Sequence, residues 1–134
     1  MFGGQGNTGG GIPDGSDGFS ARMMWRDGGA VEQYLYHPGQ PGFFGESLPW
    51  VVPESGEQIL FEPGQWHTVT HEIELNTPGS SDGYLKAYLD GNEVLSADNL
   101  RFRDINDFAI DGLYFSTFFG GSDMSWAPQG DQAC

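Results

Sequence analysis

The sequence predicts an all-β fold, a β-sandwich or jelly roll of antiparallel strands. Glycine accounts for 22 of the 134 residues and proline for 8, and these two residue types supply the backbone geometry of tight turns. Between the glycine-rich turns, short segments alternate apolar and polar residues, which is the pattern of half-buried strands. Many short strands at regular spacing are typical of sandwiches and jelly rolls.

The length of the chain favours a single domain over residues 1–134. The formal net charge is −14, and only 5 residues are lysine or arginine. Nucleic-acid binding needs clustered cations, and an anionic membrane surface repels an acidic chain, so neither partner is expected. No segment is apolar enough to span a membrane, and the first residues lack the basic start and apolar run of a secretory signal.

The clearest predicted hairpin lies near the N-terminus. Residues 19–26 alternate apolar and polar side chains, as a half-buried strand does. Residues 30–36 alternate in the same way, and the turn signal Asp27-Gly28-Gly29 stands between the two segments. We therefore expect two antiparallel strands joined by a three-residue loop.

That loop length decides which side chains meet across the hairpin. A three-residue loop pairs Arg22 with Tyr34 and Ser20 with Tyr36, and cross-strand partners lie on the same face of a sheet. Arg26 falls on this face as well. The hairpin thus predicts one polar patch of a serine, two arginines and two tyrosines, which a slip of one position would break up.

The other elements follow from shorter signals. Residues 1–18 are rich in glycine and are expected to form a loop, in which Asp14 and Asp17 indicate a turn rather than a calcium site. Asp90-Gly91 predicts a tight hairpin. Further strands are expected at about residues 50–52, 57–62, 66–76, 83–90, 92–97, 100–103 and 110–119. The last of these is rich in aromatic residues and is expected to be buried on both faces.

Other residues that carry chemistry are weaker candidates. His67 and His71 lie four positions apart, but on a strand this is not the helical spacing of a zinc pair, and no third ligand is evident. His71 falls in the apolar row of residues 66–76, which indicates a core position. Glu72 and Glu74 share one strand face, and a solvated surface explains them more simply than a pair of glycosidase carboxylates. No metal and no cofactor are therefore expected.

Three segments carry a resemblance to a known family. They are residues 19–26 with Tyr34-Leu35-Tyr36, residues 75–79 with Asp82-Gly83, and residues 112–123 with Trp126-Ala127-Pro128. Together they cover most of the chain, and it resembles polysaccharide lyase family 14, the alginate and related polyuronate lyases. The resemblance implies a concanavalin-like jelly roll, a secreted protein and an acidic polysaccharide as substrate.

The resemblance also implies the residues of a site. The serine, arginine and two tyrosines implicated in the family correspond to Ser20, Arg22, Tyr34 and Tyr36. The family also uses a lysine, in a motif that ends in an aromatic residue and Gly-Gly. Phe2-Gly3-Gly4 resembles the end of that motif, so the lysine would lie a few residues before Met1. We therefore expect this chain to lack N-terminal strands of the family's fold.

The chemistry of such a lyase fits these residue types. A polyuronate lyase removes the proton at C5 of a uronate and expels the glycosidic oxygen at C4. Arg22 suits neutralisation of the carboxylate, because guanidinium binds carboxylate through two parallel hydrogen bonds. Tyr34 or Tyr36 suits proton transfer, and a tyrosine base needs nearby cations to lower its pKa from about 10. Ser20 suits binding of the carboxylate or orientation of a tyrosine, and Arg26 suits substrate binding.

Two other classes of function stay open from the sequence. Tyrosine and tryptophan also stack on sugar rings, so the main alternative is a jelly-roll module that binds carbohydrate without catalysis. A structural sandwich would need only the alternation of residues. The acidic composition is at odds with an anionic substrate, and of the 5 cationic residues only Arg22 and Arg26 fall on the predicted patch.

Overall fold

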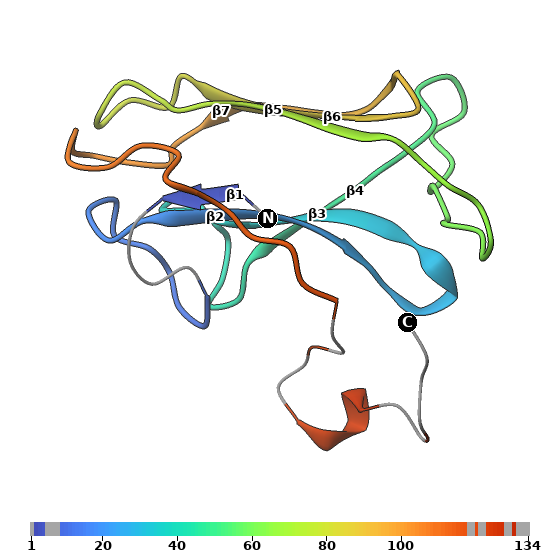
Figure 1. Cartoon of the computed structure of the whole chain (residues 1–134). Coiled ribbons are helices and arrows are strands. Elements are labelled where there is room, and N and C mark those ends of the chain that lie inside the picture. Colours follow the sequence, from blue (N-terminus) through green and yellow to red (C-terminus); the bar gives the residue numbers. More distant parts are fainter. Residues whose placement is uncertain (1, 5–8, 118–119, 121–122, 128–129, 131–134) are drawn as a thin grey trace.

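The computed structural model describes residues 2–4, 9–117, 120, 123–127 and 130. Its strands form two antiparallel sheets that lie face to face as two layers (Figure 1), so the predicted β-sandwich is confirmed. The helical elements of this part of the chain are two single 3-10 turns, Asp27–Gly29 and Met124–Trp126. Among the described residues, no helix has the length and apolar character needed to cross a membrane.

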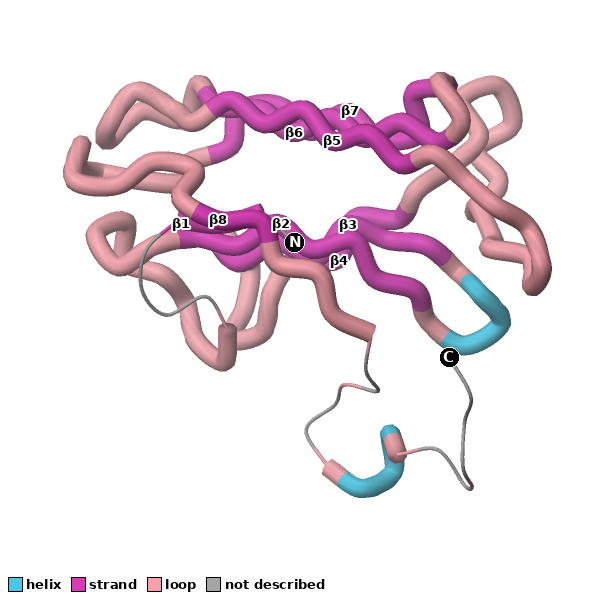
Figure 2. Tube along the Cα trace, in the orientation of Figure 1, coloured by secondary structure: helices cyan, strands magenta, loops and turns pink. Residues whose placement is uncertain are grey.

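The larger sheet has five strands in the order β4-β3-β2-β1-β8, and the smaller has three in the order β5-β6-β7 (Figure 2). The five strands of the larger sheet are β1 (Phe2–Gly4), β2 (Phe19–Trp25), β3 (Val31–Tyr36), β4 (Glu46–Pro49) and β8 (Gly112–Leu113). The smaller sheet consists of β5 (Val69–Glu74), β6 (Gly83–Leu89) and β7 (Asn92–Leu100).

The β2–β3 hairpin has the predicted register. Ser20 pairs with Tyr36 and Arg22 with Tyr34, and the loop between the strands closes with a hydrogen bond of 3.0 Å from the Gly29 N–H to the Arg26 carbonyl. This loop needs glycine, because Gly28 and Gly29 have φ angles of 70° and 81°. The expected face-sharing of the serine, arginine and tyrosine side chains is therefore confirmed.

The core lies between the sheets and consists of two apolar clusters. Its buried members alternate along β2, β3 and β6 with residues that point outward. The first cluster contains Phe19, Ala21, Leu35, Leu85, Leu100, Phe102 and Phe108. The second contains Val31, Trp50, Ala87 and Val94. Because both clusters combine residues of both layers, burial of these side chains holds the sandwich together.

The segment between the sheets differs from its prediction. Residues 50–52 and 57–62 are not strands; they form only isolated bridges, Val51 with Gln58 and Leu60 with Ala30. The strand that pairs with β3 instead lies at 46–49. This segment still connects the layers, because the Val51 N–H donates to the Val94 carbonyl at 3.0 Å.

Three other predictions of element boundaries are wrong. Residues 1–18 are not all loop, because β1 pairs with β2 and β8. The expected strand at 66–76 shortens to β5, and β7 runs through Leu100 without the break expected after residue 97. Arg101 and Arg103, expected in a strand at 100–103, therefore lie beyond the end of β7.

The aromatic-rich segment at 110–119 also departs from its prediction. Only Gly112–Leu113 forms a strand, and Leu113 and Phe115 are 72% and 89% exposed rather than buried. Residues 118 and 119 lie outside the described residues. Trp66, which precedes β5, is 98% exposed, so apolar side chains are exposed near one edge strand of each sheet.

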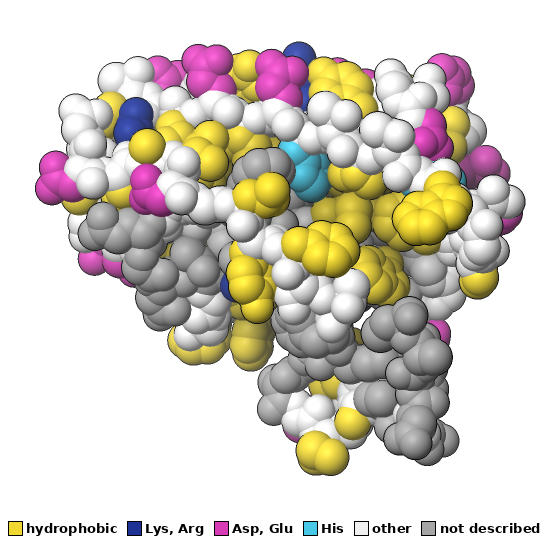
Figure 3. All heavy atoms as spheres, viewed as in Figure 1, with side chains coloured by type: hydrophobic (Ala, Val, Ile, Leu, Met, Phe, Trp, Pro, Cys, Tyr) yellow, Lys and Arg dark blue, Asp and Glu magenta, His cyan; other side chains and the backbone are white. Residues whose placement is uncertain are grey.

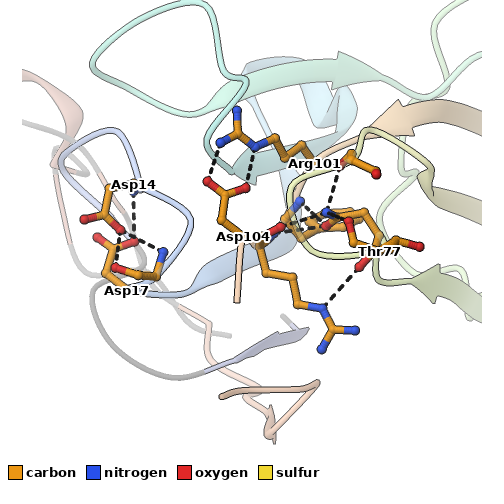
Figure 4. Close-up of polar contacts among 10 residues, drawn as sticks. Asp14, Asp17, Thr77, Arg101 and Asp104 are labelled. Carbon is orange, nitrogen blue, oxygen red and sulfur yellow. Dashed lines mark hydrogen bonds and ion pairs between the residues drawn. The ribbon is translucent and has the colours of Figure 1, made fainter. Parts of the chain in front are cut away.

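A buried amide fastens the end of β5 to the segment after β7. Asn76 is 1% exposed, and its Oδ1 accepts from the Phe102 and Arg103 N–H groups at 2.7 and 3.0 Å. Its Nδ2 donates to the carbonyls of Thr77, Ser80 and Arg103, each at 2.8 Å. Figure 4 shows this region beside the Arg101–Asp104 ion pair.

The predicted Asp14–Asp17 turn is confirmed. The Asp14 N–H donates to Oδ1 of Asp17 at 3.0 Å, and Asp14 Oδ1 accepts from the Ser16 N–H at 2.8 Å (Figure 4). The carboxylates are thus occupied in closing the turn.

On the face in Figure 3, acidic side chains gather over the β5–β7 layer and hydrophobic ones between the two layers.

We expect Gln33→Met to stabilise the protein. Gln33 is fully buried on the inner face of β3, and neither amide atom has a hydrogen-bond partner among the described residues. Burying an amide without partners costs about 1–3 kcal/mol, so a methionine of similar shape should raise the free energy of unfolding by about 1 kcal/mol in urea titrations. Gln58→Met is the control and should destabilise, because Gln58 Nε2 donates to the Val31 carbonyl at 2.6 Å. A less stable Gln33→Met would contradict the prediction.

The second stability prediction concerns pH. His71 lies on β5 with its ring 5.7 Å from that of Trp50, and burial lowers the pKa of His71 from 6.5 to about 4. As the pH falls below 6.5, the unfolded state takes up a proton that the folded state resists, so the free energy of unfolding decreases until about pH 4. Between pH 7.5 and 5 this loss should be about 1–2 kcal/mol in urea titrations. His71→Phe should show a smaller loss, and equal losses in the two proteins would rule out His71 as the cause.

Candidate active site

The polar patch lies on the face of the larger sheet that points away from the smaller one. Neighbouring residues of β2 and β3 fill the core, so strand alternation turns Ser20, Arg22, Tyr34 and Tyr36 outward. Ser20 and Tyr36 are 0% and 5% exposed, while Arg22 and Tyr34 are half-buried. Ser20 and Tyr36 are buried although they point away from the core, because further chain covers this face.

The two tyrosines and two arginines form a stacked set. The Tyr34 and Tyr36 rings meet edge to face with centroids 5.5 Å apart. The Arg22 guanidinium lies 5.0 Å from the Tyr36 ring centroid, and that of Arg26 lies 5.5 Å from the Tyr34 centroid. Guanidinium groups at this distance are attracted to the ring face, so each tyrosine has its own cation.

The surroundings of the two hydroxyls separate their acidities. Burial raises the pKa of Tyr34 above its ordinary value, and a hydrogen bond with Tyr36 raises it further. Burial also opposes ionisation of Tyr36, but hydrogen bonds with the Gly10 backbone, Tyr34 and the Gly45 backbone outweigh it, together with the charge of Arg22. The pKa of Tyr36 therefore lies below its ordinary value. Of the two groups, Tyr36 is the one that ionises more readily.

Two glycine-containing loops lie against these tyrosine and arginine side chains. A side chain at Gly9 would meet Nη2 of Arg22 at 2.8 Å, and one at Gly45 would meet the Tyr34 ring at 2.9 Å. The backbone itself therefore lies against the site side chains at both places. These loops were not part of the predicted patch, since nothing local in the sequence indicates that they fold over it.

Glu32 is a further member that the sequence analysis missed. Its Oε1 accepts from Nε of Arg26 at 2.7 Å and lies 2.6 Å from Nη2. Ser47 of β4 also donates to this oxygen at 3.3 Å. Strand alternation could have identified this residue, because Glu32 is two residues before Tyr34 and so falls on the same strand face. Arg26 keeps 37% of its side chain exposed despite the ion pair.

The histidines and other acidic residues lie elsewhere. His37 pairs with Glu46 at 2.8 Å, and His67 pairs with Asp90 at the same distance. Glu72 accepts from the Tyr84 hydroxyl on the exposed side of the smaller sheet. In the described part of the chain, no three histidine, cysteine, aspartate or glutamate residues gather in a way that could hold a metal ion. Cys134 lies outside the described residues.

Solved structures share this fold. The marine PL-14 alginate lyase from Aplysia kurodai gives a TM-score of 0.73 with 32% identity over 94% of this chain. The alginate lyase Aly36B gives 0.70 with 31% identity over 93% of this chain, and a double mutant of that enzyme forms a complex with alginate tetrasaccharide. The chain spans 54% and 52% of the lengths of these two enzymes.

A curated relative and a family model also match. Exolysin of Paramecium bursaria Chlorella virus 1 is 26% identical over 125 residues, which are 78% of this chain and 19% of Exolysin. The chain thus spans a fifth of that protein's length. The family model described as Polysaccharide lyase 14 matches residues 1–134. The chain therefore belongs to the polysaccharide lyase 14 family.

Proposed function

We propose that this protein is a polysaccharide lyase that cleaves a uronate-containing polymer, of the alginate or glucuronan type, by β-elimination. The observation that carries the proposal is the stacked set on β2 and β3, in which Arg22 and two tyrosines of unequal acidity share one face. Family membership and the alginate lyases among the similar structures support it. They favour a lyase over a module that only binds carbohydrate, and they support action on an extracellular polymer.

The reaction needs a cation for the substrate carboxylate. Removal of the C5 proton leaves negative charge that spreads into this carboxylate, so a cation beside it stabilises the transition state. We assign this part to Arg22, whose guanidinium is held over Tyr36 at 5.0 Å. Ser20 pairs across the hairpin with Tyr36 and, being fully buried, would orient Tyr36 rather than bind the carboxylate. Arg26, still 37% exposed beside Glu32, would bind a second part of the acidic polymer.

The two tyrosines fit the two proton transfers. Tyr36, with the lowered pKa, would act as the base and take the C5 proton. The electron pair of that C–H bond forms the C4–C5 double bond as the C4–O bond breaks. Tyr34, whose raised pKa keeps it protonated, would donate its proton to the leaving oxygen. A proton moving from Tyr36 to Tyr34 along their hydrogen bond would then restore the starting state.

The first test is for the unsaturated product. The chain is incubated with alginate or with glucuronan, and the ultraviolet absorbance of the new C4–C5 double bond is followed. We expect a rise with at least one polymer, and a faster rise as the pH is raised toward the pKa of Tyr36, which lies below about 10. A neutral glucan without carboxylates is the control and should give none. A product that forms only when the chain is extended to include the family's lysine would still support a lyase. Binding of the acidic polymers without product in both the given and the extended chain would favour the carbohydrate-binding alternative.

The second test removes single groups from the site. Tyr36→Phe should lower kcat by about 100-fold or more, because loss of a general base typically costs 10² to 10⁴. Arg22→Ala should lower kcat as well, because it removes the charge that stabilises the transition state.

The matched control is Tyr84→Phe. It deletes a hydroxyl that donates to Glu72 at 2.6 Å on the other sheet, and it should leave kcat and KM unchanged. Full activity in Arg22→Ala would show that the assigned mechanism is wrong, even if the protein is a lyase.

A further inference from the structure

The two loops beside the tyrosine pair are far apart in sequence and close in space. Residues 9–11 bring Gly9 against Arg22 and the Gly10 backbone to Tyr36. Residues 42–45 bring Gly45 against Tyr34, and its backbone hydrogen-bonds both tyrosine hydroxyls. Since neither loop is a strand, something other than a sheet ladder must hold both in place.

One side chain, Gln40, connects these loops. It is 6% exposed, and its Oε1 accepts from the His37 N–H at 3.1 Å. Its Nε2 reaches the Gly11 carbonyl at 3.2 Å. The same nitrogen reaches three carbonyls of the second loop, those of Gly42 at 2.7 Å, Phe43 at 3.3 Å and Phe44 at 3.2 Å.

The chemistry of this contact requires an amide. The two N–H groups of Nε2 are shared among four carbonyl oxygens, and Oε1 serves a backbone donor. A carboxylate of the same shape would place negative charge against those carbonyls, and an apolar side chain would leave them without a donor. Gln40 thus has backbone partners in both loops, on either side of the site.

We propose that Gln40 is a positioning residue that holds the loops of residues 9–11 and 42–45 against the hydroxyls of Tyr34 and Tyr36. Its role in catalysis rests on the proposed function, but its effect on the tyrosines does not.

The contacts of Gln40 affect the ionisation of both tyrosines. Without Gln40, the Gly10 and Gly45 N–H groups would leave Tyr36, and its pKa would rise toward the ordinary value. Tyr34 would lose burial, and its pKa would fall toward the ordinary value. The charged groups beside the pair, namely Arg22 and Arg26 with its partner Glu32, are the same in the variant. The His37–Glu46 pair, next to Gln40 in the chain, also keeps both of its residues.

The test measures these ionisations in the whole chain without substrate. Tyrosine labelled with ¹³C at Cζ is titrated by NMR, and the two signals are assigned with Tyr34→Phe and Tyr36→Phe. In Gln40→Met the Tyr36 midpoint should move up and the Tyr34 midpoint down, so the gap between them narrows. Gln40→Leu should act in the same direction without adding a charge, and it serves as the second variant if the methionine variant does not fold.

Asn76→Leu is the matched control. Asn76 is also a buried amide whose nitrogen donates to three backbone carbonyls, and none of its hydrogen bonds goes to the site loops. Its loss should lower the free energy of unfolding while leaving both tyrosine midpoints in place. Equal shifts in Asn76→Leu and the Gln40 variants, or unmoved midpoints in the Gln40 variants, would overturn the proposal.

Activity is the second readout and separates this inference from the proposed function. If the chain is a lyase, Gln40→Met should lower kcat near neutral pH by about tenfold, change KM less, and shift the pH profile of kcat upward. If the gap between the two tyrosine midpoints narrows in the Gln40 variants but the wild-type chain makes no unsaturated product, the result would support the role of Gln40 and count against the lyase. A lyase whose Gln40 variants keep the wild-type pH profile would count against Gln40 alone.

Discussion

The pairing of β2 with β3 is the constraint on which the site depends. Six consecutive pairs, from Ser20–Tyr36 to Trp25–Val31, fix both faces of the hairpin at once. The register that buries Phe19 and Leu35 in the core therefore also turns Arg22 outward. A slip of one residue would expose the apolar row and bury the arginines. The free-energy cost of this change is far larger than the stabilisation that any single contact provides. Burial in the core thus protects the geometry of a site that lies outside it.

Positive charge is scarce in this chain, and the contacts of its cations explain how it is used. Arg101 pairs with Asp104, and Arg103 donates to the carbonyls of Asn76 and Phe108. Lys86 lies over the Tyr84 ring on the other sheet. The two remaining arginines lie over the two site tyrosines, and Arg26 forms an ion pair with Glu32. Tyr36 faces Arg22, whose charge adds to the hydrogen bonds with the Gly10 backbone, Tyr34 and the Gly45 backbone that lower the pKa of Tyr36.

The hairpin could be predicted because its signals are local: alternation, a turn and a loop of three residues. The rest depends on contacts across long sequence distances. β1 contains two glycines in three residues, and only its pairing with β2 and β8 makes it a strand. Gln40 contacts Gly11 across 29 residues of sequence, and no periodicity reports such a contact. The aromatic run at 110–119 was misjudged because composition indicates a strand but not whether a neighbour exists to cover it.

The acidic composition of the chain, together with its small basic site, affects how the protein meets other molecules. At long range a polyanion meets the net charge of −14 and is repelled. At short range it meets arginines that are partly shielded from water. Dissolved salt at 0.1 M screens the long-range repulsion beyond about 10 Å, but it screens the short-range attraction to the arginines much less. Encounter with an anionic polymer should therefore become faster as salt is added, the reverse of what most polyanion-binding proteins show.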